Sequence, residues 1–196
     1  MATKTDNNDP AAKLELRRHF LRSYHAGEPI HVLDCCQATG FLWKTLREEF
    51  PLASYWGLDV KPKKGRLKLD SVRVLSQPGW PQNVVDVDTY GSPWKHWAAL
   101  LPHVTKPMTV FLTIGQMKSG IGPQCSHDKN FDRVLGINFR TLDVPPAIRF
   151  RLADLAMLTS FGAVEKFGLQ IIEAKESVSD QVNARYIGLR LEPLKG

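Results

Sequence analysis

Short apolar runs and stretches with helical spacing alternate along this chain. The short runs predict strands at residues 30–34, 55–60, 66–70, 83–88, 108–114, 168–174 and 184–191. Helical spacing occupies residues 12–24, 41–50, 93–101 and 146–161. Strands and helices that alternate in this way favour parallel pairing with right-handed crossovers. We therefore expect an α/β, doubly wound domain.

Two segments fall outside this alternation. Residues 1–11 are rich in Asn, Asp and Lys, and we expect them to be disordered, with residues 12–196 forming a single domain. Between about residues 115 and 145 the chain contains Gly120 and Gly122 and shows no clear periodicity. An unpatterned stretch of this length is typical of a lid or substrate-binding insertion, unless it contains short helices.

The end of the first predicted strand carries the strongest indication of a ligand site. After Asp34 comes a loop of small residues that contains Cys36, Ala38 and Gly40 and leads into a helix. Backbone N–H groups in such a loop can approach a ligand closely. The second strand ends at Asp59, where a carboxylate would bind the ribose hydroxyls of a nucleotide-type ligand.

The chemistry of this loop disfavours a phosphate. Cys36 and Ala38 stand where a dinucleotide loop would have glycine, and no Gly-Lys-Ser/Thr sequence follows. Asp34 would repel a phosphate and attract a cation. A ligand with a ribose and a positive centre but no phosphate fits better, and S-adenosylmethionine has that description.

Two motifs carry a resemblance to known families. The run from Leu33 and Asp34 to Gly40 resembles the first motif of the class I S-adenosylmethionine methyltransferases, in the Asp-x-x-x-Ala-Ser/Thr-Gly form of some RNA methyltransferases. The run Val-Asp-Val-Asp-Thr-Tyr-Gly-Ser-Pro at 85–93 resembles the Asp-Pro-Phe/Tyr-Gly-Ser-Pro motif of the tRNA guanine-N2 methyltransferases. This alignment matches Asp88 to the family's aspartate and places Thr89 where the family has proline. The similar segments cover roughly residues 30–115.

The resemblance implies a Rossmann-like methyltransferase fold, with a mainly parallel seven-stranded sheet and an antiparallel strand near the C-terminus. It implies S-adenosylmethionine as the cofactor. The expected cofactor-binding residues are Asp34, Cys36, Ala38, Gly40, Asp59 and Asp70. Asp70 ends a predicted strand, where it could meet the adenine amine or serve as a plain turn residue.

The second motif supplies the expected catalytic residues, Asp88 and Tyr90. Asp88 could accept the hydrogens of an exocyclic amine as that nitrogen becomes tetrahedral, while Tyr90 could stack on the base. Ser92 in the same motif is expected to contact the substrate. The alternative for Asp88 is a strand-end residue that caps the next helix. In that helix we expect Trp94 and Trp97 to pack and His96 to be exposed.

The net charge of +6 favours a polyanionic partner. Residues 13–22 and 61–68 are basic clusters, and each is either a solvated surface or a phosphate contact. Lys61, Lys63 and Lys64 of the second cluster are the expected substrate-binding cations. We expect the substrate to be a nucleobase nitrogen of nucleic acid, with RNA favoured over DNA.

Other functions stay open. One alternative is a methyltransferase for a small molecule or a protein, and another is a non-catalytic binding module. The tRNA guanine-N2 enzymes carry a large C-terminal domain for which this chain has no room, so the insertion, the N-terminal helix or a partner protein would have to select the substrate. No apolar run reaches the ~20 residues that span a bilayer, and the polar N-terminus favours a cytoplasmic location. Three cysteines without Cys/His spacing predict no metal site.

Overall fold

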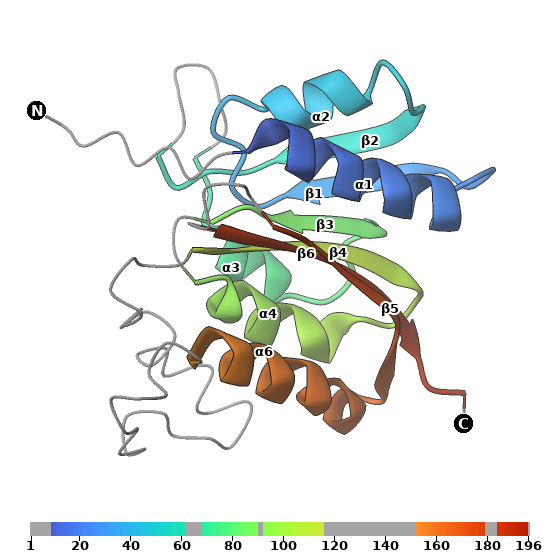
Figure 1. The fold of residues 1–196 in the computed structure, drawn as a ribbon. Coiled ribbons are helices and arrows are strands. Elements are labelled where there is room, and N and C mark those ends of the chain that lie inside the picture. The colour runs from blue at the N-terminus through green and yellow to red at the C-terminus, as the bar shows by residue number, and fades with distance from the viewer. Residues whose placement is uncertain (1–8, 62–67, 90–91, 116–151, 179–183, 196) are drawn as a thin grey trace, which may run out of the picture.

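A computed structural model describes residues 9–61, 68–89, 92–115, 152–178 and 184–195. These residues form a six-stranded sheet with helices on both faces (Figure 1). The helices are α1 (Pro10–Tyr24), α2 (Phe41–Leu46), α3 (Ser71–Leu75), α4 (Trp94–Leu100) and α6 (Leu152–Gly162). The strands are β1 (Ile30–Asp34), β2 (Leu52–Gly57), β3 (Val84–Val87), β4 (Met108–Gly115), β5 (Leu169–Val178) and β6 (Ala184–Pro193). Short 3-10 helices, η1 (Leu101–His103) and η3 (Ala163–Phe167), follow α4 and α6.

The strand order is β2-β1-β3-β4-β6-β5. Pairing is parallel from β2 to β4, and β6 runs antiparallel to both β4 and β5. This confirms the α/β class, the mainly parallel sheet and the antiparallel strand near the C-terminus. The seventh strand, expected at residues 66–70, is not found among the described residues. Lys68 makes a single bridge to Asp59, and Asp70 already caps α3.

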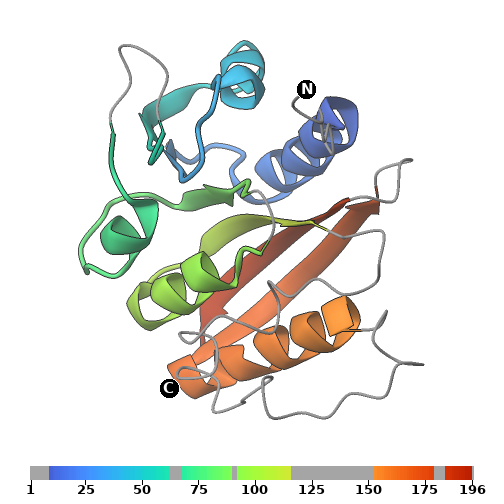
Figure 2. The same ribbon diagram turned by 90° about the vertical axis from the view of Figure 1, so that its left-hand side faces the viewer.

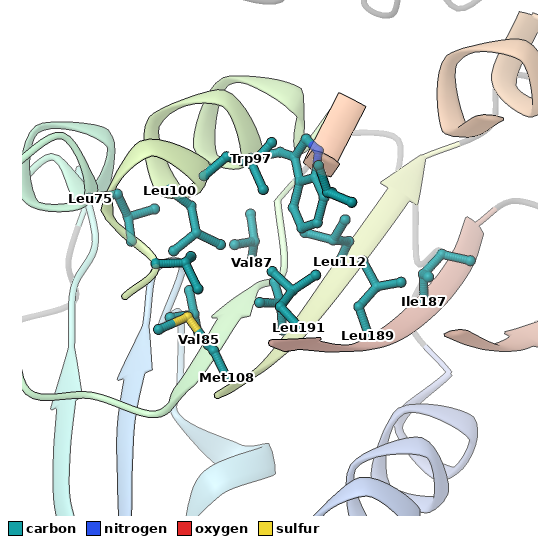
Figure 3. Close-up of a cluster of buried hydrophobic side chains, with 14 of the residues drawn as sticks. Leu75, Val85, Val87, Trp97, Leu100, Met108, Leu112, Ile187, Leu189 and Leu191 are labelled. Carbon is teal, nitrogen blue, oxygen red and sulfur yellow. The ribbon is translucent and has the colours of Figure 1, made fainter. Parts of the chain in front are cut away.

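Helices cover the two faces of the sheet unequally. Helices α1 and α2 lie on one face, and α3, α4 and α6 lie on the other (Figures 1 and 2). Alternate residues of a strand point to opposite faces, so Val32 and Val84 join a core with α1 and α2. Leu33 and Val85 join the larger core on the opposite face, where Trp97 of α4 packs over Leu112, Leu189 and their neighbours (Figure 3).

Helix α1 begins and ends with well-formed caps. The Asp9 carboxylate accepts a hydrogen bond from the Ala12 N–H at 3.0 Å, and Pro10 occupies the first turn, where a missing N–H costs least. The helix ends at Tyr24, and His25 N–H still donates to the Leu21 carbonyl. Residues 10 and 11, which the sequence placed in a disordered segment, are therefore helical. Residues 1–8 of that segment lie outside the described residues.

Helix α1 packs tightly against β6. A Cβ atom built on Gly188 of β6 would lie 2.3 Å from the Phe20 ring of α1. No side chain at position 188 would fit beneath the Phe20 ring, so the close approach of α1 to β6 requires glycine there.

The insertion expected at about 115–145 lies outside the described residues, apart from Gly115. Within the described ranges, no helix has the length and apolar character needed to cross a membrane.

Candidate cofactor and active site

The carboxyl ends of β1, β2 and β3 meet at one edge of the sheet, because β1 lies between the other two. Backbone hydrogen bonds join the loop after β1 to both neighbours. Cys35 N–H donates to the Asp86 carbonyl at 2.8 Å, and Gln37 N–H donates to the Leu58 carbonyl at 2.9 Å. In open α/β sheets, ligands bind outside such carboxyl ends.

The loop from Asp34 to Gly40 bends through two left-handed residues. Ala38 has φ of +44°, and Gly40 has φ of +69° at the start of α2. Glycine adopts this conformation freely, whereas Ala38 adopts it at a cost. A hydrogen bond from Gly40 N–H to the Gln37 carbonyl, 2.6 Å long, closes the turn.

Asp59 is bound directly to this loop. Its Oδ2 accepts a hydrogen bond from Ala38 N–H at 3.0 Å, and its Oδ1 accepts one from Lys61 N–H at 2.8 Å. A carboxylate has about four lone-pair positions, so each oxygen keeps one for a further donor. The structure therefore brings together Ala38, Gly40 and Asp59, three of the expected cofactor-binding residues.

Asp34 supports the loop from the interior. Its side chain accepts hydrogen bonds from Tyr55 Oη at 2.8 Å and from Cys36 N–H at 3.3 Å. Burial and the nearby Asp86 carboxylate raise the pKa of Asp34 to about 7. Burial likewise raises the pKa of the Cys36 thiol above its usual range, so Cys36 is a packing thiol at neutral pH.

A residue that sequence reasoning missed fills the space behind the loop. Gln37 is buried, and a Cβ atom built on Gly57 of β2 would lie 2.4 Å from its side-chain amide carbon. Gly57 therefore leaves room for the Gln37 side chain. The available signal was Gly57 itself, which lies inside the strand expected at residues 55–60, because glycine inside a strand often marks close approach of another group.

Two ion pairs connect α1 to the end of β3. Arg17 donates from Nε to Asp86 Oδ2 at 2.8 Å and from Nη2 to Oδ1 at 2.6 Å. One helical turn earlier, Lys13 Nζ lies 2.6 and 2.7 Å from the two oxygens of Asp88. Four helical residues rise by about 6 Å, and two strand residues span about 6.6 Å. The spacing of the cations therefore matches that of the carboxylates.

This arrangement corrects the interpretation of the first basic cluster. Lys13 and Arg17 are only 4% and 1% exposed, so they are neither a solvated face nor a contact for phosphate. Arg18 binds Glu49 and Glu15 on the surface, and Arg22 lies 3.9 Å from Glu49. Among the described residues, the carboxylates of Asp34, Asp86 and Asp88 act on Arg17, so this group has one more carboxylate than the two cations Lys13 and Arg17 when Asp34 is ionised.

The second motif is only partly described. Asp88 lies partly buried just beyond β3, bound to Lys13, while Tyr90 lies outside the described residues. Ser92 Oγ accepts a 3.4 Å hydrogen bond from Trp94 N–H at the start of α4. The buried Thr89 Oγ1 has no hydrogen-bond partner within the described part of the chain. Asp88 is thus a partner of α1 rather than a cap of α4.

The other expected site residues have varied surroundings. Asp70 Oδ1 accepts a hydrogen bond from Val72 N–H at 2.9 Å and so caps α3 from an exposed position. Lys61 is exposed beside Asp59, and Lys63 and Lys64 lie outside the described residues. His96 was expected to be exposed, and this is wrong.

His96 is partly buried on α4 because its ring packs toward α3. His96 Nε2 lies 3.0 Å from Ser71 Oγ, and burial lowers the pKa of His96 to about 4. It is therefore neutral at physiological pH. Trp94 and Trp97 on the same helix are fully buried, as their spacing predicts.

The fold is similar to that of several solved structures, whereas comparison of the sequence finds no relative. No protein-family model matches the sequence, and no curated protein sequence matches it. Trm1 from Pyrococcus horikoshii, solved with S-adenosyl-L-methionine, matches with a TM-score of 0.64 and 15% identity, over 95% of this chain and 56% of that one. This chain thus spans little more than half the length of that protein.

Two further structures cover most of this chain. The plantazolicin methyltransferase BamL, solved with a triazolic desmethylPZN analog and SAH, gives a TM-score of 0.59 at 10% identity, over 95% of this chain and 87% of that one. TYW2 from M. jannaschii, solved with AdoMet, gives 0.55 at 9% identity, over 94% and 77%. Likeness at these identities is a likeness of fold. The chain therefore shares the Rossmann-like α/β fold of these three structures.

Proposed function

We propose that this chain binds S-adenosylmethionine at the carboxyl ends of β1 and β2 and transfers its methyl group. The observation that carries the proposal is the 3.0 Å hydrogen bond from Ala38 N–H to Asp59, which joins the small-residue loop to the carboxylate that would bind a ribose. The likeness in fold to structures solved with S-adenosylmethionine or SAH supports it.

The ribose, the amino-acid part and the positive charges of the cofactor each have a group of matching chemistry in this site. The free lone pairs of Asp59 suit the two ribose hydroxyls, and charge-assisted bonds of this kind are strong. Backbone around Ala38 and Gly40 suits the close approach of the amino-acid part. The surplus negative charge around Asp34 suits a ligand that carries a sulfonium and an ammonium.

Methyl transfer from a sulfonium is an in-line displacement. The acceptor lone pair forms the new bond to the methyl carbon as the bond between sulfur and carbon breaks, and sulfur keeps that electron pair. The protein therefore contributes chiefly by placing the acceptor in line and excluding water. This needs no metal and no covalent intermediate on the protein.

We propose that the acceptor is a nucleobase nitrogen, with RNA favoured over DNA. Asp88 follows β3, which pairs directly with β1, so this carboxylate lies next to the loop that would bind the cofactor. It would accept hydrogen bonds from an exocyclic amine, with Tyr90 against the base and Ser92 near the substrate. The proton that the nitrogen loses after methyl transfer would pass by way of this carboxylate to water. The net charge of +6, with Lys61, Lys63 and Lys64 after β2, suits a polyanion.

The leading alternative is a smaller acceptor. BamL has this fold and was solved with a triazolic desmethylPZN analog beside SAH, so the fold by itself does not select nucleic acid. A small-molecule methyltransferase predicts no affinity for RNA, whereas the nucleobase proposal predicts affinity that falls steeply as salt rises. A non-catalytic module predicts cofactor binding without transfer.

The test is transfer of tritium from S-[methyl-³H]adenosylmethionine to unmodified RNA transcripts, to single-stranded and duplex DNA, and to a metabolite extract. We expect label in RNA from the wild-type protein and loss of that label in Asp88→Ala, with cofactor affinity nearly unchanged because Asp88 acts mainly in the transition state. Glu48→Ala, on the exposed surface after α2, is the matched control. Full transfer by Asp88→Ala would reject the mechanism, and label in the extract alone would favour the smaller acceptor.

A further inference from the structure

Lys13 is a buried cation that the methyl-transfer scheme does not yet use. It lies on α1, about 75 residues before Asp88 in the sequence, and its Nζ contacts both carboxylate oxygens. The same Nζ lies 5.1 Å from the centre of the Tyr186 ring on β6, within the range of a cation–π contact. Its own exposure is 4%, so substrate cannot reach it directly.

The position of Lys13 is fixed from several directions. One turn further along α1, Arg17 binds Asp86 through two hydrogen bonds. At the start of the helix, Asp9 N–H donates to Tyr186 Oη at 3.0 Å. These contacts hold α1 against β3 and β6, and the Lys13 ammonium has little freedom to leave Asp88.

A fixed ammonium fixes the carboxylate that it binds. Lys13 uses one lone-pair position on each Asp88 oxygen, which leaves about one on each for another donor. An Asp at the end of a strand could otherwise rotate about its side-chain bonds, and a misplacement of about 1 Å can cost on the order of a hundredfold in rate. The orientation of Asp88 therefore depends on α1.

We propose that Lys13 is a positioning residue for Asp88. It holds the carboxylate in one orientation at the end of β3 and leaves both remaining lone-pair positions to an acceptor amine. This inference rests on the proposed function, and it makes the N-terminal helix an essential part of the active site. Lys13 itself touches neither cofactor nor substrate.

The test compares Lys13→Met with Lys13→Arg and with Arg18→Met, which removes a surface cation from the same helix. Three quantities are measured: cofactor affinity by calorimetry, the single-turnover rate of methyl transfer to unmodified RNA transcripts at saturating RNA, and the carboxyl ¹³C NMR signal of Asp88. We expect Lys13→Met to lower the rate by about tenfold or more. Cofactor affinity should stay within about twofold, because the cofactor does not contact Lys13.

The NMR signal separates a positioning role from a general loss of structure. In Lys13→Met the Asp88 signal should shift and broaden while the Asp86 signal stays in place. Lys13→Arg should recover most of the rate, and Arg18→Met should match the wild type. Lys13→Gln keeps an N–H donor without the charge, and it provides the same comparison if Lys13→Met does not fold.

The outcomes distinguish this inference from the function on which it rests. An unchanged rate together with an unchanged Asp88 signal in Lys13→Met would overturn the positioning role. If the wild-type protein binds cofactor and methylates no RNA, the proposed acceptor is wrong, and the Asp88 signal alone then decides whether Lys13 orients the carboxylate.

Discussion

Arg17 of α1 and Asp86 of β3 form a two-bond ion pair in the interior of the protein, with Nη2 and Oδ1 2.6 Å apart. Trp43 Nε1 adds a third hydrogen bond to Asp86 Oδ2 at 2.7 Å. The pair lies directly beneath the loop that would bind the cofactor, because Asp86 is the register partner of Asp34. Asp86 thus joins α1, through Arg17, and α2, through Trp43, to β3 beside the candidate cofactor site.

Removal of one member of this pair should destabilise the fold strongly. Arg17→Met leaves a buried carboxylate without its cation, which typically costs about 3–5 kcal/mol. Urea denaturation should show this as a lower midpoint with little change in slope. The double variant Arg17→Met/Asp86→Asn removes both charges and should recover part of the loss. A midpoint in Arg17→Met equal to that of the wild type would show that the pair contributes little.

Asp34 should make stability depend on pH near neutrality. Burial and the neighbouring Asp86 raise the pKa of Asp34 from 3.8 to about 7 in the folded protein. Between these values the folded state holds a proton that the unfolded state has released, so the Asp34 contribution to stability falls as pH rises from about 4 to about 7. Asp34→Asn removes this fall and should be more stable than the wild type at pH 8. Urea curves at pH 5 and pH 8 give the comparison, and equal pH dependence in the two proteins would refute the effect.

Ionisation of Asp34 should strengthen cofactor binding, although it lowers the stability of the fold. Ionised Asp34 attracts a cation, so S-adenosylmethionine affinity of the wild type should rise with pH through about 7. Asp34→Asn should bind more weakly at pH 8, with a flatter dependence on pH. Calorimetric titration at both pH values measures it. A steeper rise in Asp34→Asn than in the wild type would assign the pH dependence to another group.

Gly40 should be needed for both its backbone conformation and its small size. It has φ of +69° at the start of α2, where a β-branched side chain is strained and would intrude on the ligand. Gly40→Val should therefore weaken S-adenosylmethionine binding by tenfold or more, about 1.4 kcal/mol. Gly79→Val is the matched control, because Gly79 has φ of +87° and no atom within 4 Å of an added Cβ. Gly79→Val should lose comparable stability and keep its affinity for S-adenosylmethionine. An equal loss of affinity in both variants would mean that backbone strain, and not contact with the ligand, causes the weaker binding of Gly40→Val.

The sequence predicted the elements that follow from local pattern. The apolar runs at β1, β3 and β4 were found within a residue or two because each is flanked by turn residues and consists mostly of apolar residues. Helix α2 ends earlier than its apolar pattern predicts, at Leu46, where turns replace helical hydrogen bonds. Asp34 and Asp59 both bind the loop after β1, as expected. The second strand itself lies at Leu52–Gly57 rather than at 55–60, so Asp59 follows the strand by two residues.

What the sequence did not predict depends on contacts between distant segments. Helix periodicity alone does not show which face of α1 meets another element, so the sequence predicts its basic residues to lie on the surface. The signal was present in two spacings, Lys13 with Arg17 on the helix and Asp86 with Asp88 on an apolar strand. The two spacings can be matched only once it is known that α1 lies over β3 and runs antiparallel to it, so that Lys13 meets Asp88 and Arg17 meets Asp86. The buried Gln37 depends in the same way on the backbone of β2.

Binding of S-adenosylmethionine to the wild-type protein and to Asp59→Ala, measured by isothermal titration calorimetry, tests the proposed function most directly. Each charge-assisted hydrogen bond contributes about 1.5–3 kcal/mol, so we predict saturable binding by the wild type and at least tenfold weaker binding by Asp59→Ala. Glu48→Ala should bind as the wild type does. Absence of binding by the folded wild-type protein, or affinity within a factor of about two in Asp59→Ala, would contradict the account.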